Sequence, residues 1–142
     1  MSKHETARKV VHGTGTFEVK SWDESPYDEV DGLPKLTRAN VTYAHQGVID
    51  GEGTSSSLMV YAADASASFV SLERVIGNVG GRSGSFVMQG SGSYSSADGI
   101  ARGNCFVVPG SGTGDLAGLR GEGGFVAGHQ PPGTITFDYY FE

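Results

Sequence analysis

The chain has 142 residues, which is enough for one domain with a buried core. Its net charge of −6 excludes the basic surface that binding to nucleic acid or to an anionic membrane requires. The single cysteine, Cys105, excludes an internal disulfide, and no apolar run approaches the roughly 18 residues of a membrane-spanning helix.

The N-terminal residues and the remainder of the chain differ in character. Residues 1–12 are polar and without periodicity, so we expect a flexible tail. They also lack the apolar segment of a secretory signal, and a cytoplasmic location is therefore expected. Residues 13–142 predict a single β domain, because Phe, Tyr, Val, Thr and Ser are frequent while glycine, at 23 residues, far exceeds its usual share of about 7%.

Short alternating segments separated by turn signals follow one another from residue 13 onward. The first predicted strand is Thr14–Trp22, and the acidic, proline-containing stretch 23–31 predicts a long loop that covers one end of the fold. Strand character resumes over 36–49, and Asp50-Gly51 predicts a hairpin turn. The later strands are expected at 54–63, 64–79, 82–94, 100–108, 116–126 and 133–142, with further turns at Gly80-Gly81 and Asp98-Gly99.

One glycine-rich segment matches a phosphate-binding sequence pattern but lacks the helix that such a site requires. Gly112–Ala117 fits G-x-G-x-x-G/A, but that motif needs a helix directly after it to supply backbone donors and a dipole. The next seven residues include four glycines, each of which costs a helix about 1 kcal/mol. The segment therefore predicts a strand, a turn and a second strand rather than a nucleotide site.

Eight consecutive strands joined by tight turns favour an antiparallel meander, and eight strands can close on themselves to remove both edges. We therefore expect an all-β fold, an eight-stranded antiparallel up-and-down barrel. The glycines within strands support closure, because they permit the sharp coiling that a barrel requires.

Several segments in combination resemble a known family. The segments GTFEVKSWDESPYDE, LTRANVT, GEGT, FVSLERVIG, GGRSGSFVMQ and VVPGSGTGDLAGLRGEGGF resemble the bacterial DUF3224 family, and the resemblance covers residues 14–142. The last of them also resembles the late hairpin of allene oxide cyclases and dirigent proteins. The resemblance implies an allene oxide cyclase-like barrel and, because related barrels often associate, a homo-oligomer. It implies no activity.

The interior of such a barrel either fills with side chains or holds one small ligand. Alternation along the strands selects inward-facing candidates for ligand binding, and Arg38 is added as a charged partner for Glu73. The candidates are Arg38, Tyr61, Phe69, Glu73, Phe86, Met88 and Tyr139. This aromatic-rich set fits a pocket for a small apolar or amphipathic molecule, and it fits a filled core equally.

Glu73 is the most informative of these residues. If its strand turns Phe69 and Val75 inward, a carboxylate lies among apolar groups and must be paired, protonated or close to water. The readings left open are an ion pair with Arg38 or Arg82, a strand turned the other way with Glu73 in solvent, and a carboxyl group that acts as a catalytic base or anchors a polar ligand.

Other chemistry has little support in the sequence. The four histidines are scattered without the spacing of a metal site, so neither a metal nor a cofactor is expected, and Cys105 is expected to be a small buried apolar residue. Three function classes remain, ranked in this order with little separation: binding of a small ligand, a filled barrel with a structural or oligomerisation role, and an isomerase or cyclase that acts in the cavity.

Overall fold

The computed structural model describes residues 9–142. Most of the predicted flexible tail, residues 1–8, lies outside the described residues. The end of the predicted tail is not a tail, because the first strand begins at Val11. Val11 and His12 pair with the last strand.

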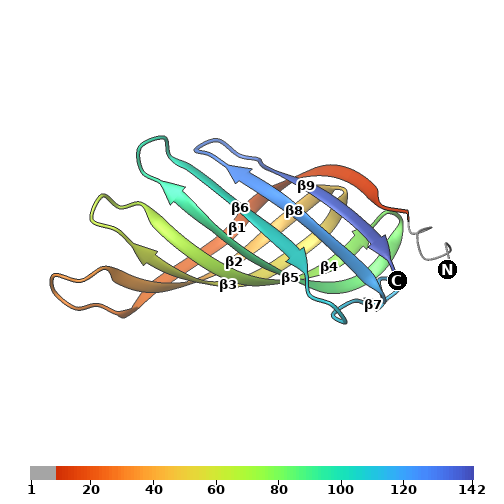
Figure 1. Cartoon of the computed structure of the whole chain (residues 1–142), viewed down its shortest axis with the longest axis horizontal. Helices are drawn as coiled ribbons and strands as arrows, with labels where there is room; N and C mark the ends of the chain where they lie inside the picture. The colour runs from red at the N-terminus through yellow and green to blue at the C-terminus, as the bar shows by residue number, and fades with distance from the viewer. Residues whose placement is uncertain (1–8) are drawn as a thin grey trace, which may run out of the picture.

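The described residues form nine strands and no helix. The strands are β1 (Val11–Asp28), β2 (Lys35–Gly47), β3 (Ile49–Tyr61), β4 (Ala67–Val79), β5 (Arg82–Ser95), β6 (Ile100–Val107), β7 (Thr113–Gly114), β8 (Leu119–Ala127) and β9 (Gly133–Phe141). All pairings are antiparallel, and β9 pairs with β1 to close the sheet (Figure 1). The predicted eight-stranded barrel is confirmed; the short β7 is an additional strand that pairs only with β5.

The acidic stretch predicted as a long loop is largely strand, so that prediction is wrong. β1 continues to Asp28, and its second half pairs with β2 through partners such as Trp22 with Val41 and Pro26 with Thr37. The ladder shifts register beside Pro26, which is how a strand accommodates a residue without an N–H donor. The chain turns only afterwards, over residues 29–34.

The turn predicted at Asp50-Gly51 is also wrong, whereas the turns at Gly80-Gly81 and Asp98-Gly99 are confirmed. β2 ends at Gly47, whose φ of 102° lies in the left-handed region that favours glycine, and β3 begins two residues later. Gly51 lies inside β3, where a Cβ atom would lie only 2.7 Å from the Cα of Gly77 on β4. It serves close strand packing rather than a turn.

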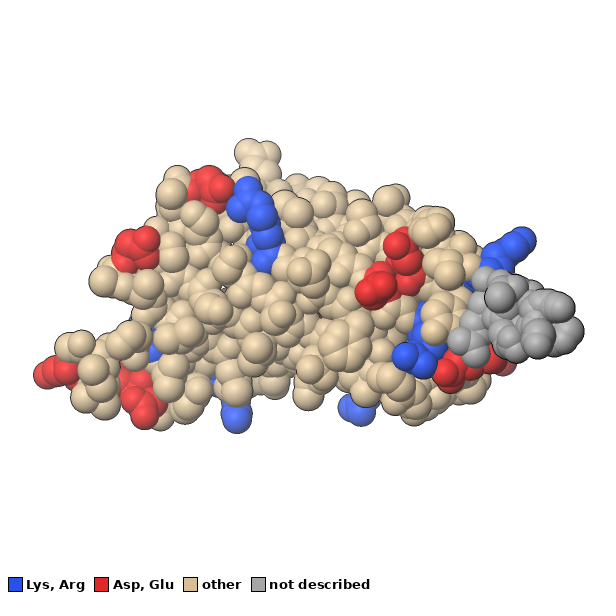
Figure 2. All heavy atoms as spheres, viewed as in Figure 1, with Lys and Arg blue, Asp and Glu red and all other residues tan. Residues whose placement is uncertain are grey.

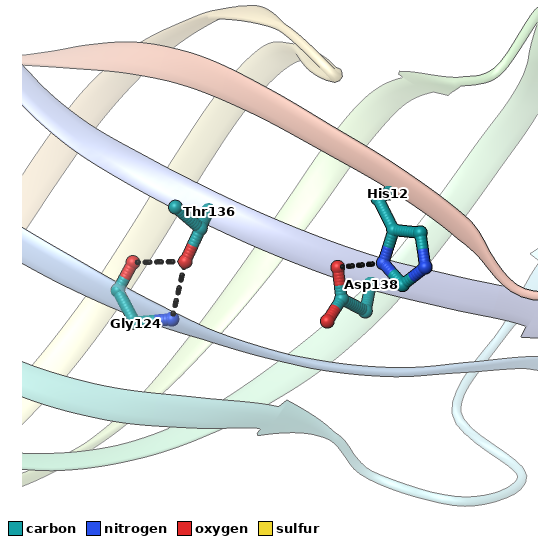
Figure 3. Close-up of polar contacts among 4 residues, drawn as sticks. All are labelled: His12, Gly124, Thr136 and Asp138. Carbon is teal, nitrogen blue, oxygen red and sulfur yellow. Dashed lines mark hydrogen bonds and ion pairs between the residues drawn. The ribbon is translucent and has the colours of Figure 1, made fainter.

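The closure seam involves both neighbours of β9, as Figure 3 shows. On one side, His12 Nδ1 of β1 lies 2.7 Å from Asp138 Oδ1. On the other, the backbone N–H of Gly124 on β8 donates to Thr136 Oγ1 at 3.3 Å. These contacts are exposed and contribute little alone, so the backbone ladders of β9 carry the closure.

One half of the barrel interior is packed solid. The cluster that fills it includes Ile49, Val75, Val79, Phe86, Leu116, Leu119, Phe137 and Tyr139. Ile49 begins β3, Val79 ends β4, and Leu116 and Leu119 follow β7 directly, so the cluster lies toward the end of the barrel that holds β7 and the C-terminus. Figure 1 shows this end of the barrel. Phe86 and Phe137 are 0% exposed, so this end is closed by side chains.

We expect Phe137→Ala to lower the free energy of unfolding by about 3–5 kcal/mol, because it leaves a void in a closely packed core. The control is Phe106→Ala on the outer wall, where the ring is 43% exposed and the loss should be about 1 kcal/mol. Urea unfolding of both variants measures the difference. Equal losses would contradict a filled half.

Candidate ligand-binding site

The other half of the barrel encloses a cavity of about 380 Å³, a volume typical of small-molecule sites. Its walls come from inward-facing positions, which occur at every second residue of a strand. The aromatic side chains that line it are Phe17, Trp22, Tyr43, Tyr61, Phe69, Tyr94 and Phe125. The few polar groups among the lining residues include His45, Ser57, Ser71 and Glu73.

Glu24 connects side chains at the open end of the cavity beside Trp22, here called the mouth. Its carboxylate accepts hydrogen bonds from Trp22 Nε1 at 3.0 Å, from Thr37 Oγ1 at 2.7 Å and from the hydroxyl of Tyr61. Trp22 lines the cavity and is 50% exposed, so the cavity reaches the surface at this end. Partial burial raises the pKa of Glu24, but the three donated hydrogen bonds outweigh it and hold that pKa below its ordinary value.

Deeper in the cavity, Glu73 and His45 form a buried pair, here called the His45–Glu73 pair. Glu73 Oε2 lies 2.6 Å from His45 Nε2, and the side chains are 14% and 4% exposed. They come from β4 and β2, which are separated by β3. Gly53 of β3 leaves the required space, because a Cβ atom there would collide with Glu73 Oε2 and lie 3.2 Å from His45 Nε2.

The hydrogen bonds of His45 indicate its protonation. Nδ1 is buried and has no hydrogen-bond partner among the described residues, whereas Nε2 bonds to Glu73. A buried N–H without an acceptor is rarer than a lone pair without a donor. We therefore assign the neutral tautomer, in which Nε2–H donates to an ionised Glu73 carboxylate, and the pair carries one negative charge.

That charge acts on two neighbouring acids. Burial, together with the negative charge of Glu73, raises the pKa of Tyr43 to about 12 and that of Cys105 to about 11. Both groups therefore stay protonated near neutral pH. Cys105 is 8% exposed and lies in the cavity wall as an unreactive thiol rather than a nucleophile.

The predicted site residues separate into three groups. Tyr61, Phe69, Glu73 and Met88 line the cavity; Phe86 and Tyr139 belong to the filled half; and Arg38 lies on the outer wall. Arg38 points outward because its neighbours Thr37 and Ala39 are 2% and 0% exposed and occupy the inward positions. Contact of any of these residues with a ligand stays a prediction.

Two of the readings of Glu73 are wrong. Its partner is His45, through a hydrogen bond, rather than Arg38 or Arg82, and Arg82 instead lies 3.8 Å from the centre of the Phe141 ring. The strand is not turned the other way either. Val70, Leu72 and Ile76 are 54%, 54% and 65% exposed and therefore face outward.

Sequence analysis missed His45, Tyr43 and Trp22. Metal-ligand spacing does not reveal His45; the signal is that it alternates with Tyr43 and Val41 and so shares the inward face of β2. Trp22 is the last residue of the first predicted strand, and the loop expected after it hid the continuation of that strand to Asp28. Among residues 9–142 no group of three potential metal ligands is close enough to hold an ion.

The outer wall carries no concentrated charge on the face drawn in Figure 2, where charged side chains are scattered toward the two ends. Several exposed apolar side chains lie on the outer faces of β3, β4, β6 and β8, among them Leu58, Leu72, Ile76, Phe106 and Val126. The predicted homo-oligomer stays a prediction. The described part of the chain has no helix long and apolar enough to cross a membrane.

Comparisons with known proteins settle the family. The family model described as "Protein of unknown function (DUF3224)" matches residues 13–139. The chain belongs to the DUF3224 family. It is similar to a crystal structure, at 1.84 Å resolution, of a DUF3224 protein with unknown function from Shewanella oneidensis MR-1, with 29% identity, a TM-score of 0.79, and coverage of 94% of this chain and 99% of that one. No curated protein matches the sequence.

In this DUF3224 protein, Gly53→Ala should break the His45–Glu73 pair without removing either side chain, because the new methyl group takes the place of the carboxylate oxygen. The loss in stability should be about 1–3 kcal/mol. NMR of the imidazole nitrogens of His45 measures the change. The control is Gly128→Ala, which meets no atom within 4 Å; unchanged nitrogen shifts in Gly53→Ala would contradict the geometry.

The depressed pKa of Glu24 makes stability depend on pH in a defined direction. The folded state binds a proton at Glu24 less readily than the unfolded state, so its contribution is complete above the ordinary glutamate pKa and is lost as pH falls through the lower folded value. Glu24→Gln should therefore lose less stability than the unmodified protein between about pH 6 and pH 3. Denaturant unfolding at both pH values tests this, with the exposed turn residue Glu29→Gln as control.

Proposed function

We propose that this DUF3224 protein binds a small molecule with a mainly apolar body in the open half of its barrel. The observation that carries the proposal is the contrast between the two halves of one interior. One half packs large side chains to complete burial, and the other keeps a cavity of about 380 Å³ that reaches the surface beside Trp22.

The energetics of packing support a binding role. A cavity forfeits the contacts of the side chains around it, and the cost rises with its volume. A fold that fills one half with Phe86, Phe137 and Leu116 has the means to fill the other. A ligand that restores these contacts when it binds accounts for the open half. A lining of aromatic side chains with few polar groups is typical of small-molecule sites.

The His45–Glu73 pair supports a second candidate, an isomerase. An ionised carboxylate oriented by a histidine and placed in an apolar cavity can take a proton from a carbon of the substrate and return it to another carbon. The step needs no oxidant or reductant, since one proton leaves the molecule and one is returned to it. The proton held on the carboxylate can exchange with water before it is returned. The predicted allene oxide cyclase-like character fits this candidate, whereas a purely structural barrel leaves the cavity unexplained.

Two measurements test the proposal. In native mass spectrometry, the purified protein should retain a bound small molecule. The second is titration with phenylbutanol followed through the fluorescence of Trp22, the only tryptophan of the chain. Binding should shift its emission, because Trp22 lines the cavity. An isomerase would also incorporate deuterium from heavy water into the retained compound.

The matched variants are two Ala→Phe changes at opposite ends of the barrel. Ala101 lines the cavity, so Ala101→Phe should abolish the phenylbutanol response. Ala117 lies exposed in the turn before β8, and Ala117→Phe should leave the response unchanged. No retained molecule and no response in the unmodified protein, or equal responses in both variants, would refute binding in this cavity.

A further inference from the structure

We infer that the ligand of the cavity carries a protonated amine on an apolar, aromatic or aliphatic body, and that the amine binds Glu73. This inference rests on the proposed function and names the chemical class of its ligand.

The first argument is the unsatisfied capacity of Glu73. Its one hydrogen bond among the described residues is the one from His45 Nε2, although an ionised carboxylate accepts about four. No Lys or Arg of the described residues lines the cavity. A buried charge with one donor and no counter-ion is costly, and an ammonium group would supply both the missing donors and the opposite charge.

The second argument is that His45 leaves this negative charge in place. His45 is 5% exposed, and its Nδ1 has no hydrogen-bond partner within residues 9–142. A doubly protonated ring would therefore bury an N–H without an acceptor, so the neutral tautomer holds and does not cancel the charge of Glu73. The other two titratable groups near Glu73, Tyr43 and Cys105, stay neutral and add no positive charge.

The third argument is the aromatic surroundings of the pair. The rings of Phe17 and Tyr43 have their centres 6.1 Å and 6.0 Å from that of His45, and 5.9 Å from each other. The faces of such rings attract cations. At the mouth, Lys35 Nζ already lies 5.4 Å from the centre of the Tyr61 ring. A ligand with a carboxylate head group would instead be repelled by the negative charge of Glu73.

The test compares three probes with the same body and different head groups: phenylbutylamine, phenylbutanol and phenylbutyrate. Isothermal titration calorimetry at neutral pH should give dissociation constants in the order amine, alcohol, carboxylate, with the amine about ten-fold tighter than the alcohol. Glu73→Gln should bring the amine and the alcohol to within about three-fold of each other. The control Glu122→Gln removes an exposed carboxylate from the outer wall and should keep the full preference.

The outcomes separate this inference from the proposed function. If none of the probes binds, both fail. If the alcohol binds but the amine gains nothing over it, or if the carboxylate binds as tightly as the amine, the cavity binds ligands but the inference is overturned. An amine preference that persists in folded Glu73→Gln also overturns it. Should Glu73→Gln fail to fold, the order of the three probes in the unmodified protein decides.

Discussion

The pairing of β1 with β9 is the constraint on which the rest of the structure depends. Without it, the sheet would have two free edges and every strand face would be open to solvent on both sides. With it, alternate residues of eight strands face a closed interior. The ladder joins the first strand of the chain to the last, so no part of the interior is complete until the whole chain has folded.

Closure makes the interior a single volume that the sequence divides unequally. Toward the C-terminal end, large residues such as Phe86 and Leu116 occupy the axis. Toward the other end, small residues at inward positions, among them Ala101 and Ala127, leave space that the aromatic rings of the wall do not fill. The same architecture thus provides a rigid base and an open chamber, and the base holds the strands that position the His45–Glu73 pair.

The barrel itself could be predicted from the sequence because its signals are local. Alternation shows that Phe69 and Glu73 share one face of their strand, and the structure shows that this face points inward. The end of β1 and the turn before β3 could not be found in this way. Pro26 and Asp50-Gly51 carry strong turn propensities that strand pairing overrides, and pairing is a property of residues distant in sequence.

The hydrogen-bond partner of Glu73 could not be predicted from the sequence for a similar reason. Opposite charge favoured an arginine, but Arg38 and Glu73 face opposite sides of the wall. His45 lies two strands away, and the contact forms only because Gly53, on the strand between, has no side chain. The division between the open and filled halves likewise depends on how side chains of many strands meet along the axis, which the pattern of any one strand does not show.

The position of the C-terminus has a practical consequence. It lies at the filled end, near β7 (Figure 1). The mouth lies beside Trp22 in the second half of β1, and the turn that follows this strand is at the opposite end of the barrel. A tether attached to Glu142 would therefore hold the molecule on a solid support with its chamber directed toward the bulk liquid, and a fusion partner added there would not obstruct entry.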